Sequence, residues 1–323
     1  MIPAGASIPI TIAAKNEARC LGACLDAVLA AMRHAADEGL GFDLLVVLDD
    51  CSDDSEAVAR GRGVRTVRSS GGKVEAQRAG LRAGPFAVFL DADVLISPPT
   101  LAALARALID RPALVVASPP RRPLAPVSRG WLARALHVYN RERGFSSQRT
   151  WFNGKCFAMR GWSVPTRAEL APRIARLPVD HFHDYAAGMR VDDIYLSRRV
   201  VADHGPAALA ETDAGCVLYR APETLRGMYR YYRRMRMELD RVSALFPELD
   251  AAAARLGARR PDRLASASPP DRRAYRLFSV ALAVCRVGYR LERAYYQHFA
   301  RSPCPAWPPV EETKCSLGTG TGG

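Results

Sequence analysis

Lysine is scarce in this chain of 323 residues, since only four of its 46 basic residues are lysines. No uninterrupted apolar run reaches the roughly 20 residues that a membrane-spanning helix needs. No Cys-x-x-Cys pair occurs among the eight cysteines, which argues against a zinc site. No Gly-x-Gly-x-x-Gly follows the first apolar segment, and this disfavours a dinucleotide oxidoreductase.

The positive charge is therefore almost all arginine, and the formal net charge is +13. Such a balance indicates an anionic partner: a nucleotide, a nucleic acid or an acidic membrane surface. A genome that favours arginine codons would also explain it. The lysines beside candidate site segments, Lys15, Lys73 and Lys155, then hint that lysine is needed there. Met1-Ile2-Pro3 does not begin a signal peptide, and with no zinc or disulfide pattern we expect a cytoplasmic protein with reduced thiols.

Two aspartates follow the apolar segment 85–90, in the run Asp91-Ala92-Asp93. A short apolar run of this kind is typical of a buried parallel strand. Open α/β sheets bind their ligands at the carboxyl ends of such strands. Carboxylate oxygens are suitable ligands for Mg²⁺ or Mn²⁺. The run therefore predicts a divalent-metal site at a strand end, although two solvated aspartates would give the same pattern.

Two further predicted strands end in polar residues. Strand 8–14 is followed by Lys15-Asn16-Glu17, and strand 42–48 is followed by the acidic cluster 49–54. We expect the three strand ends to lie along one edge of a sheet, as a nucleotide site requires.

The first part of the chain alternates strands and helices, which predicts an α/β fold with a mostly parallel sheet and helices on both faces. The predicted strands are 8–14, 42–48, 64–68, 86–90 and 113–117, with helices at 17–38, 53–61, 73–82 and 99–110. Later segments predict a strand with a closely approached glycine, Gly154, and helices at 194–202, 222–245 and 271–299. We divide the chain at 1–117, 118–245, 246–300 and 301–323, the last being a Pro-, Thr- and Gly-rich tail that we expect to be disordered.

In this order the motifs resemble the family 2 glycosyltransferases, which have a GT-A fold and use nucleoside-diphosphate sugars. The residues that carry the resemblance are Lys15-Asn16-Glu17, Asp49-Asp50-Cys51-Ser52-Asp53-Asp54, Gly72-Lys73, Asp91-Ala92-Asp93 and Asp192-Asp193-Ile194-Tyr195-Leu196. The match covers roughly residues 8–240. Ala14-Lys15 departs from the Pro-x of the family, and Cys51 stands where the family usually has glycine, so the turn there can differ.

The resemblance implies a role for each of these residues. Ala13, Glu17, Asp49 and Asp50 would line the base and ribose of a UDP- or GDP-linked sugar donor. Lys73 would approach the base or the phosphates. Asp91 would hold the ribose or metal-bound water, and Asp93 would ligate Mg²⁺ or Mn²⁺.

Asp193 would be the general base of an inverting transfer to an acceptor hydroxyl, a poor nucleophile until its proton is removed. A helix N-terminus alone would also favour acids at 192–193. The first carboxylate of this pair, Asp192, is expected to matter less than the second. The processive members of the family carry Gln-x-x-Arg-Trp and membrane helices, which this sequence lacks. The resemblance therefore implies a non-processive enzyme that adds one sugar.

Two alternatives remain open from the sequence. The run at 89–95 also resembles the first motif of haloacid-dehalogenase-type phosphatases, with Asp91 as nucleophile, Asp93 as acid/base and Lys155 among the remaining parts. That family normally carries this strand near the start of the domain, so residues 1–85 would need a separate explanation. The second alternative, a basic nucleic-acid-binding protein, has only the net charge in its favour.

Other polar patterns admit two interpretations each. His181-x-His183 could be a metal pair, but a surface loop without an acidic partner is favoured. The helix at 222–245 interleaves arginines with tyrosines and could bind diphosphate or an anionic acceptor, or could be a solvated face. The members of this pattern are Arg226, Tyr229, Arg230, Tyr231, Tyr232, Arg233, Arg234 and Arg236.

The helix at 271–299 carries an apolar stripe at three- and four-residue spacing, beside a stripe of arginines. Such a helix can lie on an anionic membrane, or its apolar stripe can pack on the protein's own core. The stripes consist of Leu277, Val280, Val284, Val287, Leu291 and Tyr295, and of Arg286, Arg290 and Arg293.

Overall fold

The computed structural model describes residues 7–144, 152, 154–255, 268–300, 302–304 and 311–314. Its main sheet has seven strands in the order β3-β2-β1-β4-β8-β6-β9, and a second sheet has the order β5-β10-β7. The main strands are β1 (Ile8–Ala14), β2 (Phe42–Asp49), β3 (Arg65–Ser69), β4 (Ala87–Asp91), β6 (Val116–Ser118), β8 (Cys156–Met159) and β9 (Leu209–Glu211). The small sheet consists of β5 (Val94–Ile96), β7 (Arg121–Pro123) and β10 (Val217–Tyr219).

The predicted mostly parallel sheet is confirmed. Strand β1 pairs in parallel with β2 and β4, and β2 pairs in parallel with β3. Only β8 runs against its neighbours β4 and β6 among the described strands of this sheet. Because β1, β2 and β4 are parallel neighbours, their carboxyl ends lie at one edge, as the sequence predicted.

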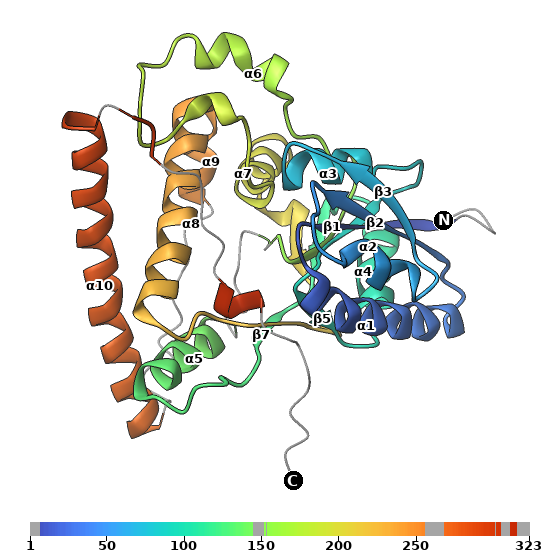
Figure 1. Cartoon of the computed structure of the whole chain (residues 1–323). Coiled ribbons are helices and arrows are strands. Elements are labelled where there is room, and N and C mark those ends of the chain that lie inside the picture. Colours follow the sequence, from blue (N-terminus) through green and yellow to red (C-terminus); the bar gives the residue numbers. More distant parts are fainter. Residues whose placement is uncertain are drawn as a thin grey trace.

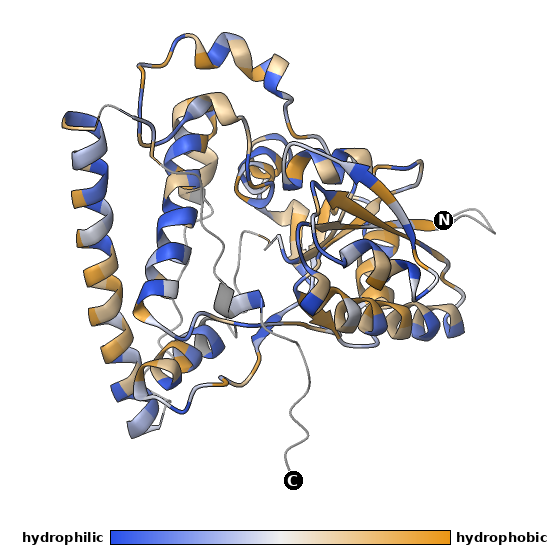
Figure 2. Ribbon diagram, in the orientation of Figure 1, coloured by the Kyte–Doolittle hydropathy of each residue, from blue (hydrophilic) through white to orange (hydrophobic). Residues whose placement is uncertain are grey.

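Helices cover both faces of the sheet (Figure 1), and its central strands are largely hydrophobic (Figure 2). One face of β1 presents Ile8, Ile10 and Ile12 to a core that includes Leu21 and Leu25 of α1. On the other face, Thr11 donates a hydrogen bond to a carbonyl of the chain just after α3. The helices of this half are α1 (Ala18–Asp37), α2 (Ser55–Arg60), α3 (Lys73–Ala79), α4 (Thr100–Asp110) and α7 (Asp193–His204). Strict alternation along a strand thus produces two separate cores.

The helical half lies beside the sheet, with the long helix α10 along one edge of the molecule and α8 between it and the sheet (Figure 1). Its helices are α5 (Trp131–Gly144), α6 (Arg167–Ile174), α8 (Leu225–Leu245), α9 (Asp250–Arg255) and α10 (Pro269–His298). This confirms the predicted helical C-terminal extension. Within the described residues, no helix has the length and apolarity to cross a membrane.

The division of the chain into parts stays a prediction. The main sheet takes strands from both sides of the proposed boundary at residues 117 and 118, because β8 inserts between β4 and β6. The tail expected to be disordered contains a short 3₁₀ helix, η4 (Glu311–Lys314), which corrects that expectation for these residues. Residues 305–310 and 315–323 lie outside the described part of the chain.

Candidate active site

The predicted site residues come together at the carboxyl ends of β1, β2 and β4. Ala13 of β1 is half-buried and lies level with Asp91 of β4 and with Val47 of β2. Asp49 is the last residue of β2 and is almost fully buried. The sheet register therefore brings residues from three separate segments into one line, which we call the carboxylate edge.

Asp49 is held on both sides by neighbouring loops. Its Oδ2 lies 3.2 Å from the Lys15 ammonium, and its Oδ1 accepts a hydrogen bond of 2.9 Å from the Gly72 amide. Gly72 has a φ of +100°, a conformation that suits glycine and few other residues. Asp50 is exposed and lies 3.9 Å from the same lysine. The Gly-Lys loop before α3 is thus tied to the end of β2.

The turn that carries Cys51 is built without the family's glycine. Cys51 donates from its thiol to the carbonyl of Ala14 at 3.2 Å, and the left-handed position falls on Asp50, with a φ of +47°. Asp53 accepts from the amide at the start of α1 and from Ser55, so this aspartate holds two helix starts in place. The acidic cluster therefore divides, with Asp49 at the carboxylate edge and Asp53 in a structural role.

Glu17 lies just before α1 and is buried beneath the edge. Its amide donates to the hydroxyl of Ser55 at 2.9 Å. Burial, and then the nearby Asp93, raise the pKa of Glu17 to about 7, against the opposing effect of Lys314. The Lys314 ammonium lies 2.5 Å from Glu17 Oε1 and donates to the Lys15 carbonyl at 3.1 Å. A residue of the C-terminal tail thus reaches the edge.

Lys73 joins the end of β4 to the acidic pair before α7. Its ammonium lies 2.7 Å from Asp91 Oδ1 and 3.2 Å from Asp192 Oδ1, and it donates to the Gly154 carbonyl at 3.0 Å. Burial acts to lower the pKa of Lys73, but Asp192 and Asp91 outweigh it and hold that pKa above the usual value. Burial likewise acts to raise the pKa of Asp91, but Lys73 and Lys155 hold it below the usual value. Lys73 and Asp91 are therefore both charged.

The predicted metal ligand Asp93 is half-buried, and no other described side chain makes a hydrogen bond or ion pair with its carboxylate. No group of three or more His, Cys, Asp or Glu side chains in the described residues could hold a metal ion. Mg²⁺ and Mn²⁺ are usually bound by one or two carboxylates together with substrate phosphates. The ends of β4 and its following turn fit that kind of site, in which the ligand completes the coordination.

Asp193 is the first residue of α7, and its position depends on a glycine. Asp193 Oδ2 accepts a hydrogen bond of 2.9 Å from the Gly154 amide. A side chain at Gly154 would place its Cβ 3.2 Å from Asp192 Oδ1 and from two atoms of Asp193, so the close approach that the sequence predicted there is confirmed. Burial and the adjacent Asp192 raise the pKa of Asp193. Its carboxylate is therefore a stronger base than an exposed aspartate.

Asp192 has a different environment from Asp193. It is fully buried, and besides Lys73 it accepts a hydrogen bond of 2.7 Å from Gln77 of α3. Gln77 was not predictable from the sequence, because a glutamine in a short helix has no pattern of its own. Asp192 therefore anchors α3 and α7 to each other.

Lys155 also lies at the site, which the sequence only hinted at. Its carbonyl accepts from the Asp91 amide at 2.9 Å, and its ammonium lies 5.0 Å from the centre of the Tyr219 ring. Burial acts to lower the pKa of Lys155, while Asp93 and Asp91 raise it further and prevail. With Lys15, Lys73 and Lys314, all four lysines of the chain lie at the carboxylate edge.

The arginine-rich helix α8 divides between two roles. Arg233 is buried and lies 2.9 Å from Glu292 of α10, and Arg236 lies 3.2 Å from Asp240. Arg234 is exposed, yet its charge contributes to the low pKa of Asp91. The interpretation of α8 as a solvated face is therefore wrong for Arg233.

The His181-x-His183 loop was also wrongly interpreted. His183 is buried, and its Nδ1 lies 2.6 Å from Asp180 Oδ2, so an acidic partner stands three residues before it. Its Nε2 lies 3.7 Å from Asp240 of α8. The histidine joins a loop to α8.

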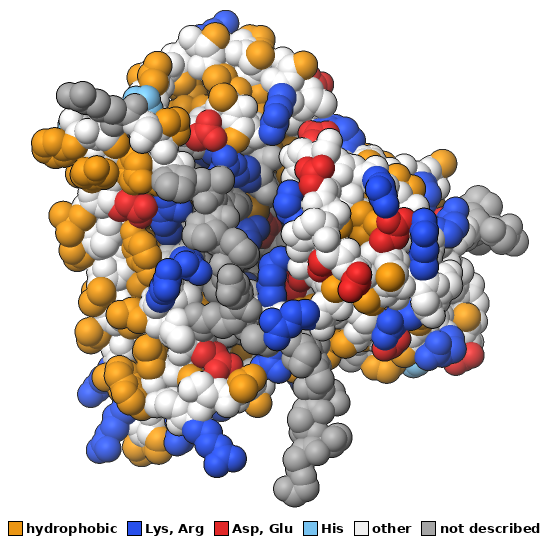
Figure 3. All heavy atoms as spheres, viewed as in Figure 1, with side chains coloured by type: hydrophobic (Ala, Val, Ile, Leu, Met, Phe, Trp, Pro, Cys, Tyr) orange, Lys and Arg blue, Asp and Glu red, His pale blue; other side chains and the backbone are white. Residues whose placement is uncertain are grey.

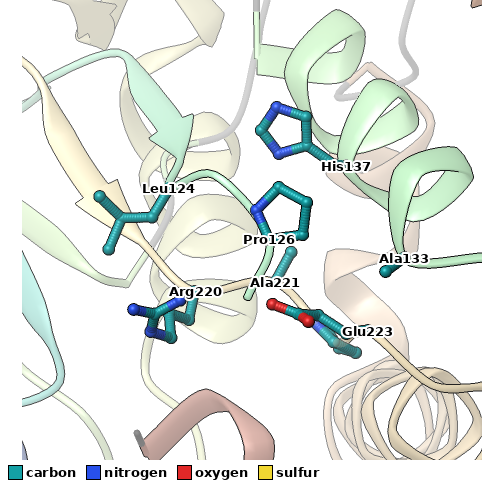
Figure 4. A pocket seen from close by; sticks show the side chains of 8 residues that line it. Leu124, Pro126, Ala133, His137, Arg220, Ala221 and Glu223 are labelled. Atoms are coloured by element: carbon teal, nitrogen blue, oxygen red, sulfur yellow. The ribbon is translucent and has the colours of Figure 1, made fainter. Parts of the chain in front are cut away.

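A small pocket beside β7, β10 and α5 is lined by none of the residues of the carboxylate edge (Figure 4). Its volume is about 10 Å³, which is the space of one water molecule. Glu223 at its rim accepts hydrogen bonds from the amides of Val127 and Ser128. Glu223 thus holds the connection between β7 and α5 in place, and the pocket beside it is too small for a substrate.

Comparison with known proteins gives a family and a set of distant structures. The family model of glycosyl transferase family 2 matches residues 10–168. No curated protein is similar enough to count as a match. Solved structures of glucosyl-3-phosphoglycerate synthase from Mycobacterium tuberculosis are similar at low identity. The complex with uridine-diphosphate is 21% identical, with 76% of this chain and 81% of that chain covered and a TM-score of 0.46.

Two other complexes of that synthase give similar values. The one with Mn²⁺, UDP-glucose and phosphoglyceric acid is 20% identical, covers 76% and 80%, and has a TM-score of 0.44. The one with Mg²⁺ and uridine-diphosphate is 18% identical, covers 76% and 80%, and has a TM-score of 0.45. At these values the similarity carries no argument about function.

The family model spans the three strand ends, the Gly-Lys loop and Asp91-Ala92-Asp93. The α/β architecture with its mostly parallel sheet agrees with the GT-A fold that the resemblance implied. The match of residues 10–168 to glycosyl transferase family 2 identifies the chain as a glycosyltransferase.

Proposed function

We propose that this enzyme moves one sugar from a UDP- or GDP-linked donor to an acceptor hydroxyl, with inversion at the anomeric carbon and without processivity. One observation carries the proposal: Gly154 links the end of β4 to the predicted base. Its carbonyl accepts from Lys73, which pairs with Asp91, and its amide donates to Asp193. The predicted donor site and the predicted base are thus held by one residue.

The donor would lie along the carboxylate edge. Ala13, Glu17, Asp49 and Asp50 would line the base and ribose, since carboxylates accept hydrogen bonds from ring N–H and hydroxyl groups. Lys73 would approach the base or the phosphates. It would have to leave Asp91 or share it, because the two are 2.7 Å apart without ligand.

Asp91 and Asp93 would hold Mg²⁺ or Mn²⁺ with the donor diphosphate. When bound, the ion stabilises the negative charge that develops on the departing phosphate. The amide of Gly154 keeps Asp193 in place, and burial keeps its carboxylate basic.

Asp193 would take the proton of the acceptor hydroxyl as that oxygen attacks the anomeric carbon. The bond from this carbon to the phosphate oxygen breaks at the same time, and its electron pair leaves with the nucleoside diphosphate. Attack from the side opposite the leaving group inverts the centre. The absence of Gln-x-x-Arg-Trp from the sequence supports transfer of a single sugar.

The family assignment favours this reaction over the two alternatives. A haloacid-dehalogenase-type phosphatase would leave unexplained why β1 and β2 carry their own site residues beside Asp91. The ion pair of Asp91 with Lys73 would also have to open before Asp91 could act as a nucleophile. A nucleic-acid-binding protein is disfavoured because acidic side chains line the edge.

Donor binding with and without Mn²⁺ tests the proposal. At about 100 times its Kd, a bound donor stabilises the fold by about 2.7 kcal/mol, which thermal unfolding detects. We expect UDP or GDP sugars to stabilise the protein more with Mn²⁺. Asp93→Ala should lose this metal-dependent part, whereas Asp110→Ala, an exposed change at the end of α4, should keep it.

Two outcomes would contradict the proposal. Unchanged metal dependence in Asp93→Ala would remove Asp93 from the metal site. Release of phosphate from simple phosphate esters, with no stabilisation by any nucleotide sugar, would favour the phosphatase.

A further inference from the structure

Helix α10 exposes a continuous apolar stripe. Seven apolar side chains at three- and four-residue spacing are between 45% and 76% exposed. They are Leu277, Val280, Val284, Val287, Leu291, Tyr295 and Phe299. At 1.5 Å per residue the stripe is about 33 Å long. Figure 3 shows hydrophobic side chains along the outer margin of the molecule, where Figure 1 places α10.

A different face of α10 packs on the protein. The buried residues are Ala274, Phe278, Ala281, Cys285 and Tyr289. They contact α5, α8 and the loop that carries Phe182. The stripe that the sequence singled out is therefore not part of the protein's own core. Single exposed apolar residues are common on protein surfaces, but a contiguous patch of this length indicates an interaction surface.

The charges of α10 are also sorted by sign between its inner and its exposed face. Its two acidic residues face the protein: Asp271 lies 3.0 Å from Arg141 of α5, and Glu292 lies 2.9 Å from Arg233 of α8. The exposed arginines are Arg272, Arg273, Arg276, Arg286 and Arg290. At 3.6 residues per turn, all of these except Arg273 fall on one flank of the apolar stripe. The exposed part of α10 is thus apolar and positive, with no acidic side chain.

This sorting decides between two kinds of partner. If two copies of α10 met along their stripes, arginines of both copies would come together, and no carboxylate of the exposed face would pair with them. An anionic membrane supplies the missing negative charge in its headgroups and an apolar boundary for the stripe. Arginines beside an apolar stripe therefore fit a lipid surface better than a second copy.

We propose that the exposed face of α10 is a docking surface for an anionic membrane. The helix lies parallel to the membrane plane, with the stripe from Leu277 to Phe299 at the boundary between headgroups and acyl chains. The flanking arginines, such as Arg276 and Arg290, contact anionic headgroups. The docking surface is separate from the carboxylate edge and does not depend on the assignment of the catalytic base.

Co-sedimentation of the full chain with vesicles tests the proposal. We expect binding to vesicles of phosphatidylcholine with phosphatidylserine and little binding to phosphatidylcholine alone. The double variant Val284→Glu/Leu291→Glu should lower the vesicle partition coefficient by roughly tenfold or more, because it places charges where apolar side chains would enter the membrane. Arg276→Gln/Arg290→Gln should lower it by roughly tenfold on anionic vesicles only.

Val67→Glu is the matched control, because Val67 is 43% exposed on the edge strand β3, on the other side of the molecule from α10 (Figure 1). It should bind anionic vesicles as the unchanged protein does, and thermal unfolding should show that all variants are folded. Equal binding by Val284→Glu/Leu291→Glu and the unchanged chain would overturn the proposal. A second result would also overturn it: the unchanged chain is a dimer in sedimentation velocity, the double variant is a monomer, and neither binds vesicles. The stripe would then be a subunit interface.

Discussion

Positive charge serves different purposes at the carboxylate edge and on the exposed face of α10. At the edge, Lys15, Lys73 and Lys314 each pair with a carboxylate that is mostly buried. On α10 the exposed cations are arginines, and the helix keeps its two acids on the inner side. The edge uses cations to hold acids in place, whereas the helix presents cations to a partner.

The geometry of Lys73 gives a physical reason for the difference. A lysine ammonium has three donors in three directions, while the arginine guanidinium is a planar fork. Lys73 uses its donors on Asp91, Asp192 and the Gly154 carbonyl, which belong to three separate segments. A planar group could not reach all three. In a chain dominated by arginine, lysine remains where this geometry requires it.

The largest effect is expected at the carboxylate edge, from Asp193→Asn. The amide cannot take a proton, so the turnover should fall by roughly 10²- to 10⁴-fold, while the donor Kd stays nearly unchanged. Steady-state rates and donor titrations measure the two quantities. Asp203→Asn at the other end of α7 should keep full turnover, because Asp203 is exposed and forms a surface ion pair with Arg199.

Full turnover in Asp193→Asn would remove Asp193 as the base. Asp192→Asn cannot serve as the control with a smaller loss that the sequence suggested. The structure buries Asp192 between Lys73 and Gln77, so its replacement disturbs two helices together.

The next largest effect is expected on stability, when a lysine of the carboxylate edge is changed to arginine and compared with the reverse change on α10. Lys73→Arg should lower the free energy of unfolding by about 3 kcal/mol, since the planar guanidinium cannot reach the buried Asp192 while it also contacts Asp91 and the Gly154 carbonyl. Arg276→Lys on the exposed face of α10 should change it by less than about 0.5 kcal/mol. Urea unfolding measures both. If the two exchanges have equal effects, the contrast between the edge and the helix disappears.

The sequence predicted the strands that carry the site better than the contacts that the site residues make. Alternation of apolar residues placed β1, β2 and β4, and parallel pairing then brought Glu17, Asp49 and Asp91 together. The partners of these acids were not predictable, because they come from distant segments. Lys314 reaches Lys15 across 299 residues, and no local pattern marks such a contact. The contact of His183 with Asp180 was within reach of sequence reasoning, as the two are three residues apart.

A smaller effect is expected from Gly154→Ala, which tests whether one residue couples both parts of the edge. The added Cβ would lie 3.2 Å from Asp192 Oδ1 and Asp193 Cγ, so these side chains must shift by tenths of an ångström. We expect the turnover to fall by about tenfold, because the base is displaced, with little change in donor Kd. Gly130→Ala is the control, since its nearest atom, the Ser128 hydroxyl oxygen, is 3.4 Å away. A loss of donor affinity with normal turnover would show that Gly154 serves the donor alone.

The smallest effect concerns the lysine of the tail. The pKa of Glu17, about 7, lies above the ordinary value of 4.5, because burial and Asp93 outweigh Lys314. A carboxyl group with a raised pKa favours the folded state when protonated. The free energy of unfolding should therefore fall as the pH rises from about 4.5 to about 7, and Glu17→Gln should remove this slope.

Lys314→Met should raise the pKa of Glu17 further and lower the free energy of unfolding at pH 8 by about 1 kcal/mol or less, as expected for a partly exposed ion pair. Carboxyl carbon NMR measures the pKa directly, and urea unfolding at several pH values measures the slope. Arg290→Met, which removes an exposed cation of α10, should leave the pKa of Glu17 unchanged. If Lys314→Met also leaves it unchanged, the tail lysine does not hold Glu17 in solution, and only three of the four lysines serve the carboxylate edge.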